Sequence, residues 1–168
     1  MRLILGIDPG SRITGYGIIE SNGIRSRHVA SGCIRIAQEA FPERLGEIFR
    51  QLSGLVDEHR PQEMAIEQVF MAKNAASALK LGQARGAAIC ACVMAGLPVY
   101  EYSPRAIKQA VVGTGGADKD QVQHMIRHIL QLEEKLSPDQ SDALAVAISH
   151  AHSSTTAQLI RSAGRRWR

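Results

Sequence analysis

Aromatic side chains are scarce in this chain: phenylalanine, tryptophan and tyrosine make up 4% of its 168 residues. We therefore expect a core of aliphatic side chains and alanine, because the hydrophobic fraction of 45% is typical of a globular protein. No apolar run approaches the ~20 residues that cross a membrane. The first residues lack the apolar segment and cleavage site of a secretory signal. These absences favour a cytoplasmic protein of one domain with no membrane partner.

Cysteine is also rare, with three residues at Cys33, Cys90 and Cys92. The odd number and the lack of a CxxC spacing argue against a disulfide framework or a zinc site. Cys90 and Cys92 lie two residues apart in a helical stretch, so their side chains should point to different faces. The pattern favours reduced thiols in the core of a protein from a reducing compartment.

The positive net charge of +4 resides in the last residues of the chain. Residues 153–168 contain four arginines and no acid, and elsewhere 16 basic residues balance 16 acidic ones. A neutral body with a basic tail indicates a polyanionic partner only weakly. We expect one α/β domain over residues 1–152, followed by a flexible basic tail over 153–168.

Local patterns predict a mixed α/β fold. Three strands are expected at 2–8, 14–20 and 24–36, joined by turns at Pro9-Gly10-Ser11 and Ser21-Asn22-Gly23. Two further strands, at 63–69 and 98–102, alternate with helices at 42–60, 74–96, 103–111, 118–132 and 139–152. Asp118 is a candidate N-cap. Three antiparallel strands followed by alternating strands and helices predict a mixed five-stranded sheet flanked by helices.

Two acids interrupt apolar strands. Asp8 closes the first strand, and Glu67 lies inside the apolar run 65–69. A carboxylate beside a core is costly unless it is paired or binds a metal. The simpler alternative is that each acid points to the solvent face of its strand.

Two more acids, Asp139 and Asp142, stand three residues apart at the start of the last predicted helix, so they project from one face. Acids in a first helical turn also stabilise the helix dipole, and one of the two could be the N-cap. Taken together, the four acids fit two-metal catalysis, since Mg²⁺ prefers oxygen ligands and two ions can activate a water and stabilise the leaving oxygen of a phosphodiester. Spacing alone does not show that the four acids converge.

Several segments carry a family resemblance: GIDPGSRITGYG at 6–17, AIEQVFMAKNAASALKLGQARG at 65–86, QAVVGTGGADKDQVQHM at 109–125 and DQSDALAVAISHAH at 139–152. They occur in the order found in the RuvC Holliday-junction resolvases, which this chain resembles over nearly its whole length. The resemblance implies a ribonuclease H-like fold and makes Asp8, Glu67, Asp139 and Asp142 the metal-binding catalytic acids. It implies two Mg²⁺ ions per subunit, which Mn²⁺ can replace in such relatives.

The resemblance also implies a homodimer that binds four-way junction DNA and nicks two strands symmetrically, in homologous recombination and DNA repair. Two matched cuts on a two-fold substrate call for a two-fold enzyme. The helix at 74–96 is apolar or small on nearly every face and needs cover beyond the sheet. A second subunit is one cover, and burial within the monomer is the alternative. A branch-migration motor is the further partner that the resemblance implies.

Residues expected at the DNA come mainly from the resemblance. Phe70 is placed at the junction centre, where its ring could stack on an unpaired base, although an aromatic at such a turn is commonly a core residue. Lys108 and Lys119 are placed near the scissile phosphate. Weaker candidates for phosphate contact are Lys73, Lys80, Arg85 and Arg12.

Three other interpretations remain open. A nucleotide-binding protein of the actin, Hsp70 and sugar-kinase type shares the strand and Asp-x-Gly-Ser motif, but it needs two such domains. The related YqgF group of RNA-processing nucleases shares the first motif only. A non-catalytic junction-binding protein would not need four acids. His124 and His128 share a helix face, which suits either a metal, the protein surface or a face turned to DNA.

Overall fold

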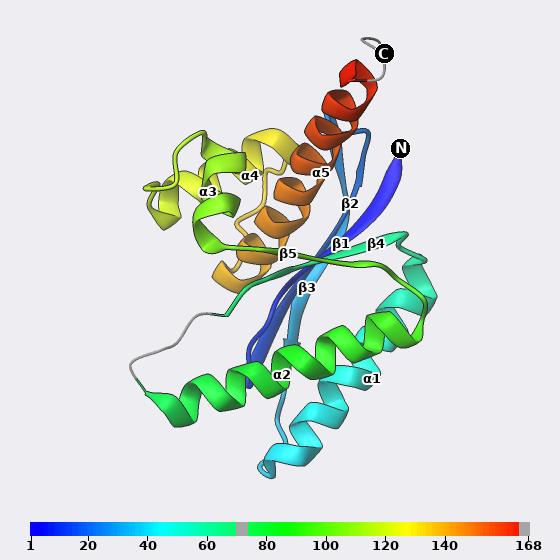
Figure 1. Ribbon diagram of the computed structural model, residues 1–168. Helices are drawn as coiled ribbons and strands as arrows, with labels where there is room; N and C mark the ends of the chain where they lie inside the picture. Colours follow the sequence, from blue (N-terminus) through cyan, green and yellow to red (C-terminus); the bar gives the residue numbers. More distant parts are fainter. Residues whose placement is uncertain (70–73, 165–168) are drawn as a thin grey trace.

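The computed structural model describes residues 1–69 and 74–164, with side chains as far as residue 154. Its strands form one sheet in the order β3-β2-β1-β4-β5 (Figure 1). β1 (Arg2–Asp8), β2 (Ile13–Ser21) and β3 (Ser26–Arg35) are antiparallel neighbours, whereas β4 (Glu63–Glu67) and β5 (Val99–Tyr102) extend the sheet in parallel with β1. The predicted mixed five-stranded sheet is confirmed.

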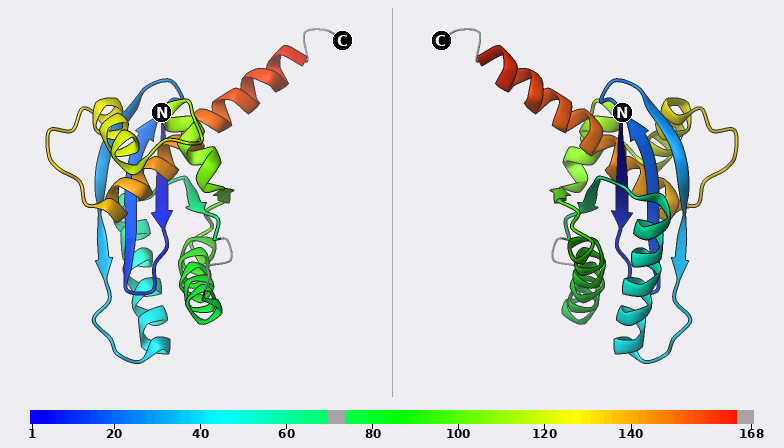
Figure 2. Two further views of the ribbon diagram at one scale, coloured as in Figure 1. Left: turned by 90° about the vertical axis from the view of Figure 1, so that its left-hand side faces the viewer. Right: turned by 90° about the vertical axis from the view of Figure 1, so that its right-hand side faces the viewer.

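Helices cover both faces of the sheet (Figures 1 and 2). α1 (Phe41–His59) and α2 (Ala75–Met94) pack on one face, and α3 (Pro104–Val112), α4 (Lys119–Leu130) and α5 (Pro138–Gly164) pack on the other. α5 continues to Gly164 instead of ending at residue 152 as predicted, and its last turns extend beyond the sheet (Figure 2). None of the helices in the described part of the chain combines the length and apolar character that a membrane crossing needs.

The central strands are buried on both sides, which explains their nearly continuous apolar sequences. In β1, Ile4 packs toward α3, α4 and α5, whereas Leu5 and Ile7 pack toward α1 and α2. Side chains alternate along a strand, so Gly6 and Asp8 share the face of Ile4. In β4, Ala65 faces the same side as Ile4, and Glu67 follows it by two residues. Asp8 and Glu67 therefore project from the face that α5 covers.

The prediction of core thiols holds for Cys92 but is wrong for Cys90, which is exposed, and Cys33 is only half-buried. All three are free thiols. Cys90 and Cys92 both belong to α2, where Cys92 is on the buried side and Cys90 is exposed. Burial raises the pKa of the Cys92 thiol to about 12, so this residue remains an unreactive core thiol.

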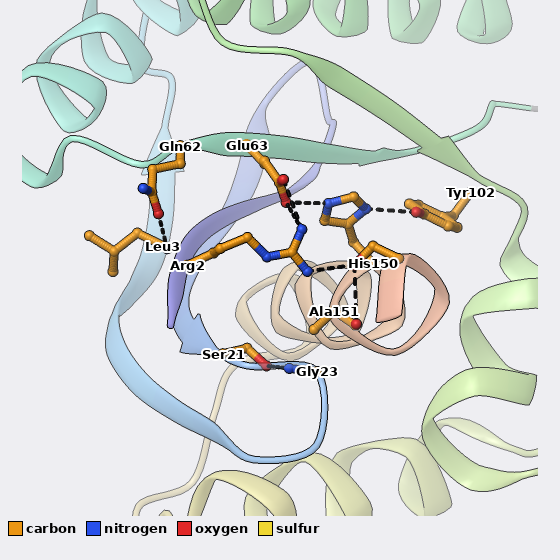
Figure 3. Close-up of polar contacts among 10 residues, drawn as sticks. Arg2, Leu3, Ser21, Gly23, Gln62, Glu63, Tyr102, His150 and Ala151 are labelled. Carbon is orange, nitrogen blue, oxygen red and sulfur yellow. Dashed lines mark hydrogen bonds and ion pairs between the residues drawn. The ribbon is translucent and has the colours of Figure 1, made fainter. Parts of the chain in front are cut away.

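A buried polar network fastens α5 to the start of the sheet (Figure 3). The His150 ring, 1% exposed, lies 2.8 Å through Nε2 from Glu63 and 2.7 Å through Nδ1 from the Tyr102 hydroxyl. Arg2 completes the network, pairing with Glu63 at 2.9 Å and donating to Ser154 at 2.8 Å. Burial lowers the pKa of His150, and the Glu63 carboxylate opposes this. The neutral ring thus donates to Glu63 and accepts from Tyr102, which sets the position of α5.

Candidate active site

Asp8 and Glu67 end two neighbouring parallel strands. The β1–β4 register pairs Ile7 with Ile66, and Asp8 and Glu67 are the next residues along each strand. Adjacent strands lie ~4.8 Å apart, so side chains on the same face at this level are close neighbours. Both acids are half-buried, and the alternative that each points freely to solvent is wrong.

The start of α5 brings the other two acids to this face. Ser137, not an acid, caps the helix: its hydroxyl accepts from the Gln140 N–H at 3.4 Å, and the Gln140 side chain accepts from the Ser137 N–H at 3.3 Å. Gln140 also donates to the Ser31 hydroxyl of β3 at 2.8 Å, and Cys33 of β3 lies 3.1 Å from the Ser137 hydroxyl. These contacts hold the first turn of α5, with Asp139, against the sheet, and Asp142 follows in the next turn.

Glycines in β1 and β2 let α5 approach the sheet closely. A Cβ on Gly15 would lie 2.0 Å from the Asp139 carbonyl oxygen, and one on Gly6 would lie 2.2 Å from the Ala143 carbonyl oxygen. Gly15 is the cross-strand partner of Asp8, so the main chain of Asp139 rests directly beside Asp8. Glycine inside a strand is a sequence signal for such an approach, and the segment 6–17 carries it.

The acids lie close enough for their charges to shift one another's pKa values. Burial, followed by the charges of Asp142, Glu67 and Asp139, raises the pKa of Asp8 to about 7. Burial and the charge of Asp142 raise the pKa of Glu67, and burial also raises that of Asp142. Carboxylates that converge in this way favour a bound cation, which would relieve both burial and repulsion.

Two lysines line a cavity of about 230 Å³ together with Glu67 and Asp142, whereas Asp8 and Asp139 are not among its lining residues. Lys119, the first residue of α4, places Nζ 3.6 Å from the Asp142 carboxylate. Lys119 and Lys108 both lower the pKa values of Glu67 and Asp142, in opposition to burial. The cavity is lined by Glu67, Pro104, Ile107, Lys108, Lys119, Val122, Asp142 and Ala145. This mixture of charged and apolar side chains suits an anionic group flanked by less polar atoms.

The donor set of this site suits a hard divalent cation, because all four side chains offer carboxylate oxygens. As the side chains stand, no three His, Cys, Asp or Glu residues among the described ones form a group that could hold a metal ion. The charges of Asp142, Glu67 and Asp139 act on Asp8, so the four acids share one region, but among the described residues their oxygens are not gathered around one point. Closing around a cation therefore requires these side chains to turn inward.

The remaining candidates have different positions. Phe70 and Lys73 lie outside the described residues. Lys80 is exposed, with Nζ 5.9 Å from the centre of the Phe41 ring, and Arg12 is exposed in the turn after β1. Arg85 is engaged by partners within the protein.

His124 and His128 lie with Arg127 and Glu133 along a cavity at the end of α4. They belong to no group suited to a metal among the described residues. Lys108 and Lys119, not these histidines, are the cavity-lining side chains of the acidic site.

A mixed sheet of this topology, with carboxylates gathered over the ends of its central strands, defines a nuclease of the ribonuclease H-like class. The family model described as "Crossover junction endodeoxyribonuclease RuvC" matches residues 4–150, and the chain belongs to this family.

Individual relatives are similar along almost the whole chain. The crossover junction endodeoxyribonuclease RuvC of Marinobacter nauticus is 60% identical over 90% of this chain and 87% of its own length. That of Alkalilimnicola ehrlichii is 56% identical over 98% of this chain and 99% of its own. The solved structure of T. thermophilus RuvC in complex with Holliday junction substrate is 34% identical, with a TM-score of 0.88 over 94% of this chain and 97% of that one.

Proposed function

We propose that this protein is a structure-specific DNA endonuclease that resolves four-way junctions by paired, symmetric nicks, using Mg²⁺ held by Asp8, Glu67, Asp139 and Asp142. The observation that carries this proposal is the convergence of two strand ends and one helix start on a single face, where burial and mutual repulsion raise the pKa of Asp8 to about 7. Membership of the RuvC family and the likeness to a junction-bound relative support the choice of substrate.

The acids provide the charge that such chemistry needs. Two Mg²⁺ ions per subunit, or Mn²⁺ in their place, would supply the positive charge that activates a water and stabilises the leaving oxygen of a phosphodiester. Asp8 and Glu67 are carried by the sheet, Asp139 by the capped first turn of α5, and Asp142 by the turn that follows. Rigid elements hold a site more precisely than loops do.

Lys108 and Lys119 are proposed to attract and orient the DNA backbone at the cavity. Lys119 is 75% exposed, so it can exchange its contact with Asp142 for one with a phosphate. Together the two cations offset part of the negative charge of the acids, which would otherwise repel the substrate. Phe70 and Lys73 remain proposed DNA contacts on the strength of the family resemblance alone.

A homodimer is proposed because α2 leaves large apolar side chains uncovered. Leu79 is 69% exposed, Val93 52% and Met94 79%. The buried side of α2 instead consists of small residues such as Ala84 and Ala88. A second copy would cover the exposed residues and match the two-fold symmetry of a four-way junction. A branch-migration motor remains a further expected partner.

The direct test uses a labelled synthetic four-way junction. With Mg²⁺, we expect paired nicks at symmetric positions, and with EDTA we expect binding without cleavage, because binding depends on phosphate contacts and not on the metal. A linear duplex of the same sequence is the control substrate and should remain largely uncut. Binding without cleavage in Mg²⁺ would favour the non-catalytic alternative, and preferential cleavage of structured RNA would favour an RNA-processing nuclease.

Lys119→Ala should slow cleavage roughly tenfold, because the loss of one charge near the reacting phosphate is worth about 1.4 kcal/mol. The variant should also bind the junction more weakly at moderate salt, with a salt slope reduced by about one unit. Single-turnover cleavage and binding isotherms at several salt concentrations measure both effects. Lys135→Ala, which removes an exposed lysine outside the cavity, is the control. Identical kinetics for both variants would remove Lys119 from the site.

A further inference from the structure

Arg85 is an arginine of α2 that lies beneath the end of β4. Its Nε donates a hydrogen bond to the main-chain carbonyl oxygen of Glu67 at 3.2 Å. Its Nη2 lies 2.7 Å from a carboxylate oxygen of Glu101, on β5. The Arg85 side chain is 19% exposed, so its guanidinium is committed to partners inside the protein. From the sequence, Arg85 was a candidate for a contact with a DNA phosphate, but its partners in the structure are groups of the protein itself.

The carbonyl that accepts from Arg85 belongs to the last residue of β4. Continuing the β1–β4 ladder cannot satisfy it, since β1 ends at Asp8 and the next residue, Pro9, has no N–H to donate. Arg85 supplies the missing donor. The position at which the strand ends is thus fixed by a side chain that lies far away in the sequence.

Arg85 also ties three elements together at this point. The main chain after Glu67 is joined to β5, because the Gln68 N–H donates to the Tyr102 carbonyl at 2.8 Å. The pair between Arg85 and Glu101 joins α2 to the same strand. The Glu67 carboxylate lies on the other face of the sheet from Arg85, where Asp142, Lys108 and Lys119 are its charged neighbours. A shift of α2 or β5 would consequently reach Glu67 through its main chain.

We propose that Arg85 is a positioning residue for the acidic site, which fixes the end of β4 and thereby the direction in which the Glu67 carboxylate reaches the cavity. This inference rests on the proposed function, since it assumes that Glu67 binds a divalent cation. The planar guanidinium is suited to the task because it serves two acceptors at once, whereas a lysine ammonium on a flexible stem holds such a geometry less well. Partners that orient metal-binding side chains typically change metal affinity or activity roughly 10- to 100-fold when they are removed.

The test compares Arg85→Ala, Arg85→Lys and Glu101→Gln in the full-length protein. The first measurement, without DNA, is the Mg²⁺ concentration that gives half of the maximal rise in thermal denaturation midpoint. The second is the Mg²⁺ dependence of junction cleavage at saturating DNA, and the third is the junction Kd in EDTA. Arg50→Ala is the matched control, because it breaks an exposed arginine–glutamate pair on α1, away from the site.

We expect Arg85→Ala to raise the half-saturating Mg²⁺ concentration about 10- to 100-fold in both metal titrations, with a junction Kd within about twofold of the wild type. Arg85→Lys should recover part of the loss, and Glu101→Gln should shift the metal response less, because it leaves the contact with Glu67 in place. Arg50→Ala should change none of the three quantities. If Arg85→Ala does not fold, Arg85→Lys and Glu101→Gln should still give a smaller shift in the same direction.

Two results would overturn the proposal. A weaker junction Kd in EDTA with an unchanged Mg²⁺ response would make Arg85 a phosphate contact. Unchanged values in all three measurements would make it an ordinary surface ion pair. Failure of the proposed function is recognised separately, because the wild-type protein itself would then show neither an Mg²⁺-induced stabilisation nor junction cleavage.

Discussion

Asp8→Asn is expected to abolish cleavage while leaving junction binding intact, and to stabilise the metal-free protein. The substitution keeps the size of the side chain but removes the charge that is most perturbed in the site. Removing one preorganised electrostatic group typically costs a factor of roughly 10²–10³ in rate, and we expect at least that loss here. Binding should persist because it depends on contacts to phosphates elsewhere on the surface.

The stability effect of Asp8→Asn has a definite pH dependence. Asp8 has a pKa of about 7 in the folded protein against an ordinary value of 3.8, so the folded state holds its proton more tightly. That contribution to stability is complete below about pH 4 and is lost as the pH rises through 7. The metal-free wild type should therefore lose stability over this range, relative to the variant. After allowance for solvent screening, we expect a difference on the order of 1–2 kcal/mol at pH 8.

Chemical denaturation in EDTA between pH 5 and pH 8 measures this difference, and the same series with excess Mg²⁺ should reverse it in favour of the wild type. Asp57→Asn, at an exposed position of α1, is the control and should affect neither cleavage nor the pH profile. Cleavage by the Asp8→Asn variant at the wild-type rate would place the active site elsewhere. Lost cleavage without the pH-dependent stabilisation would mean that the four acids do not repel one another as described.

The helices and strands were predictable from local sequence, but the face of the sheet from which the acids project was not. Apolar runs and turn residues located the strands, and Asp118 was confirmed as the cap of α4 by its capping box with Gln121. Because helices cover both faces of β1 and β4, their sequences are apolar in almost every position. Such strands give no alternation from which to decide the side to which Asp8 and Glu67 point.

The limits of α5 were mispredicted for a similar reason. The apolar period that marks its buried face stops near residue 152, where Ser153 and Ser154 follow. The helix nevertheless continues to Gly164, because a helix needs no buried face to extend one already formed. Whether the residues beyond 152 are flexible in solution stays a prediction, which hydrogen exchange can measure.

Arg85 shows what sequence alone cannot supply. Its charge made it a weak candidate for a phosphate contact, which is a common role of arginine in DNA-binding proteins. Its partners are separated from it by 18 and 16 residues and meet it only when α2 crosses the end of β4. Long-range contacts of this kind become visible only in three dimensions, whereas the resemblance had already made Lys108 and Lys119 candidates, in or next to the segment 109–125, and the structure places both at the cavity.

Gly15→Ala is expected to impair both stability and cleavage, because its Cβ would lie 2.0 Å from the Asp139 carbonyl oxygen. The start of α5 would have to move away from the sheet and would carry Asp139 and Asp142, in its first two turns, with it. Forcing an extra carbon into a close-packed contact costs about 1–3 kcal/mol, and a displacement of about 1 Å at a catalytic group can cost roughly 10²-fold in rate. Junction binding in EDTA should change little, since the lysines at the cavity belong to other helices.

Gly54→Ala is the matched control for this substitution. Gly54 lies in α1, where a Cβ would have nothing within 4 Å, so alanine there should stabilise the protein by about 0.5–1 kcal/mol. Urea denaturation and single-turnover cleavage, at a temperature where both variants are folded, separate stability from catalysis. Cleavage at the wild-type rate by a destabilised Gly15→Ala protein would show that the distance of α5 from the sheet does not control catalysis at the acidic site. A rate loss that persists at saturating Mg²⁺ in the fully folded variant is the result expected if the close approach of α5 to β2 sets the distance between Asp139 and Asp8.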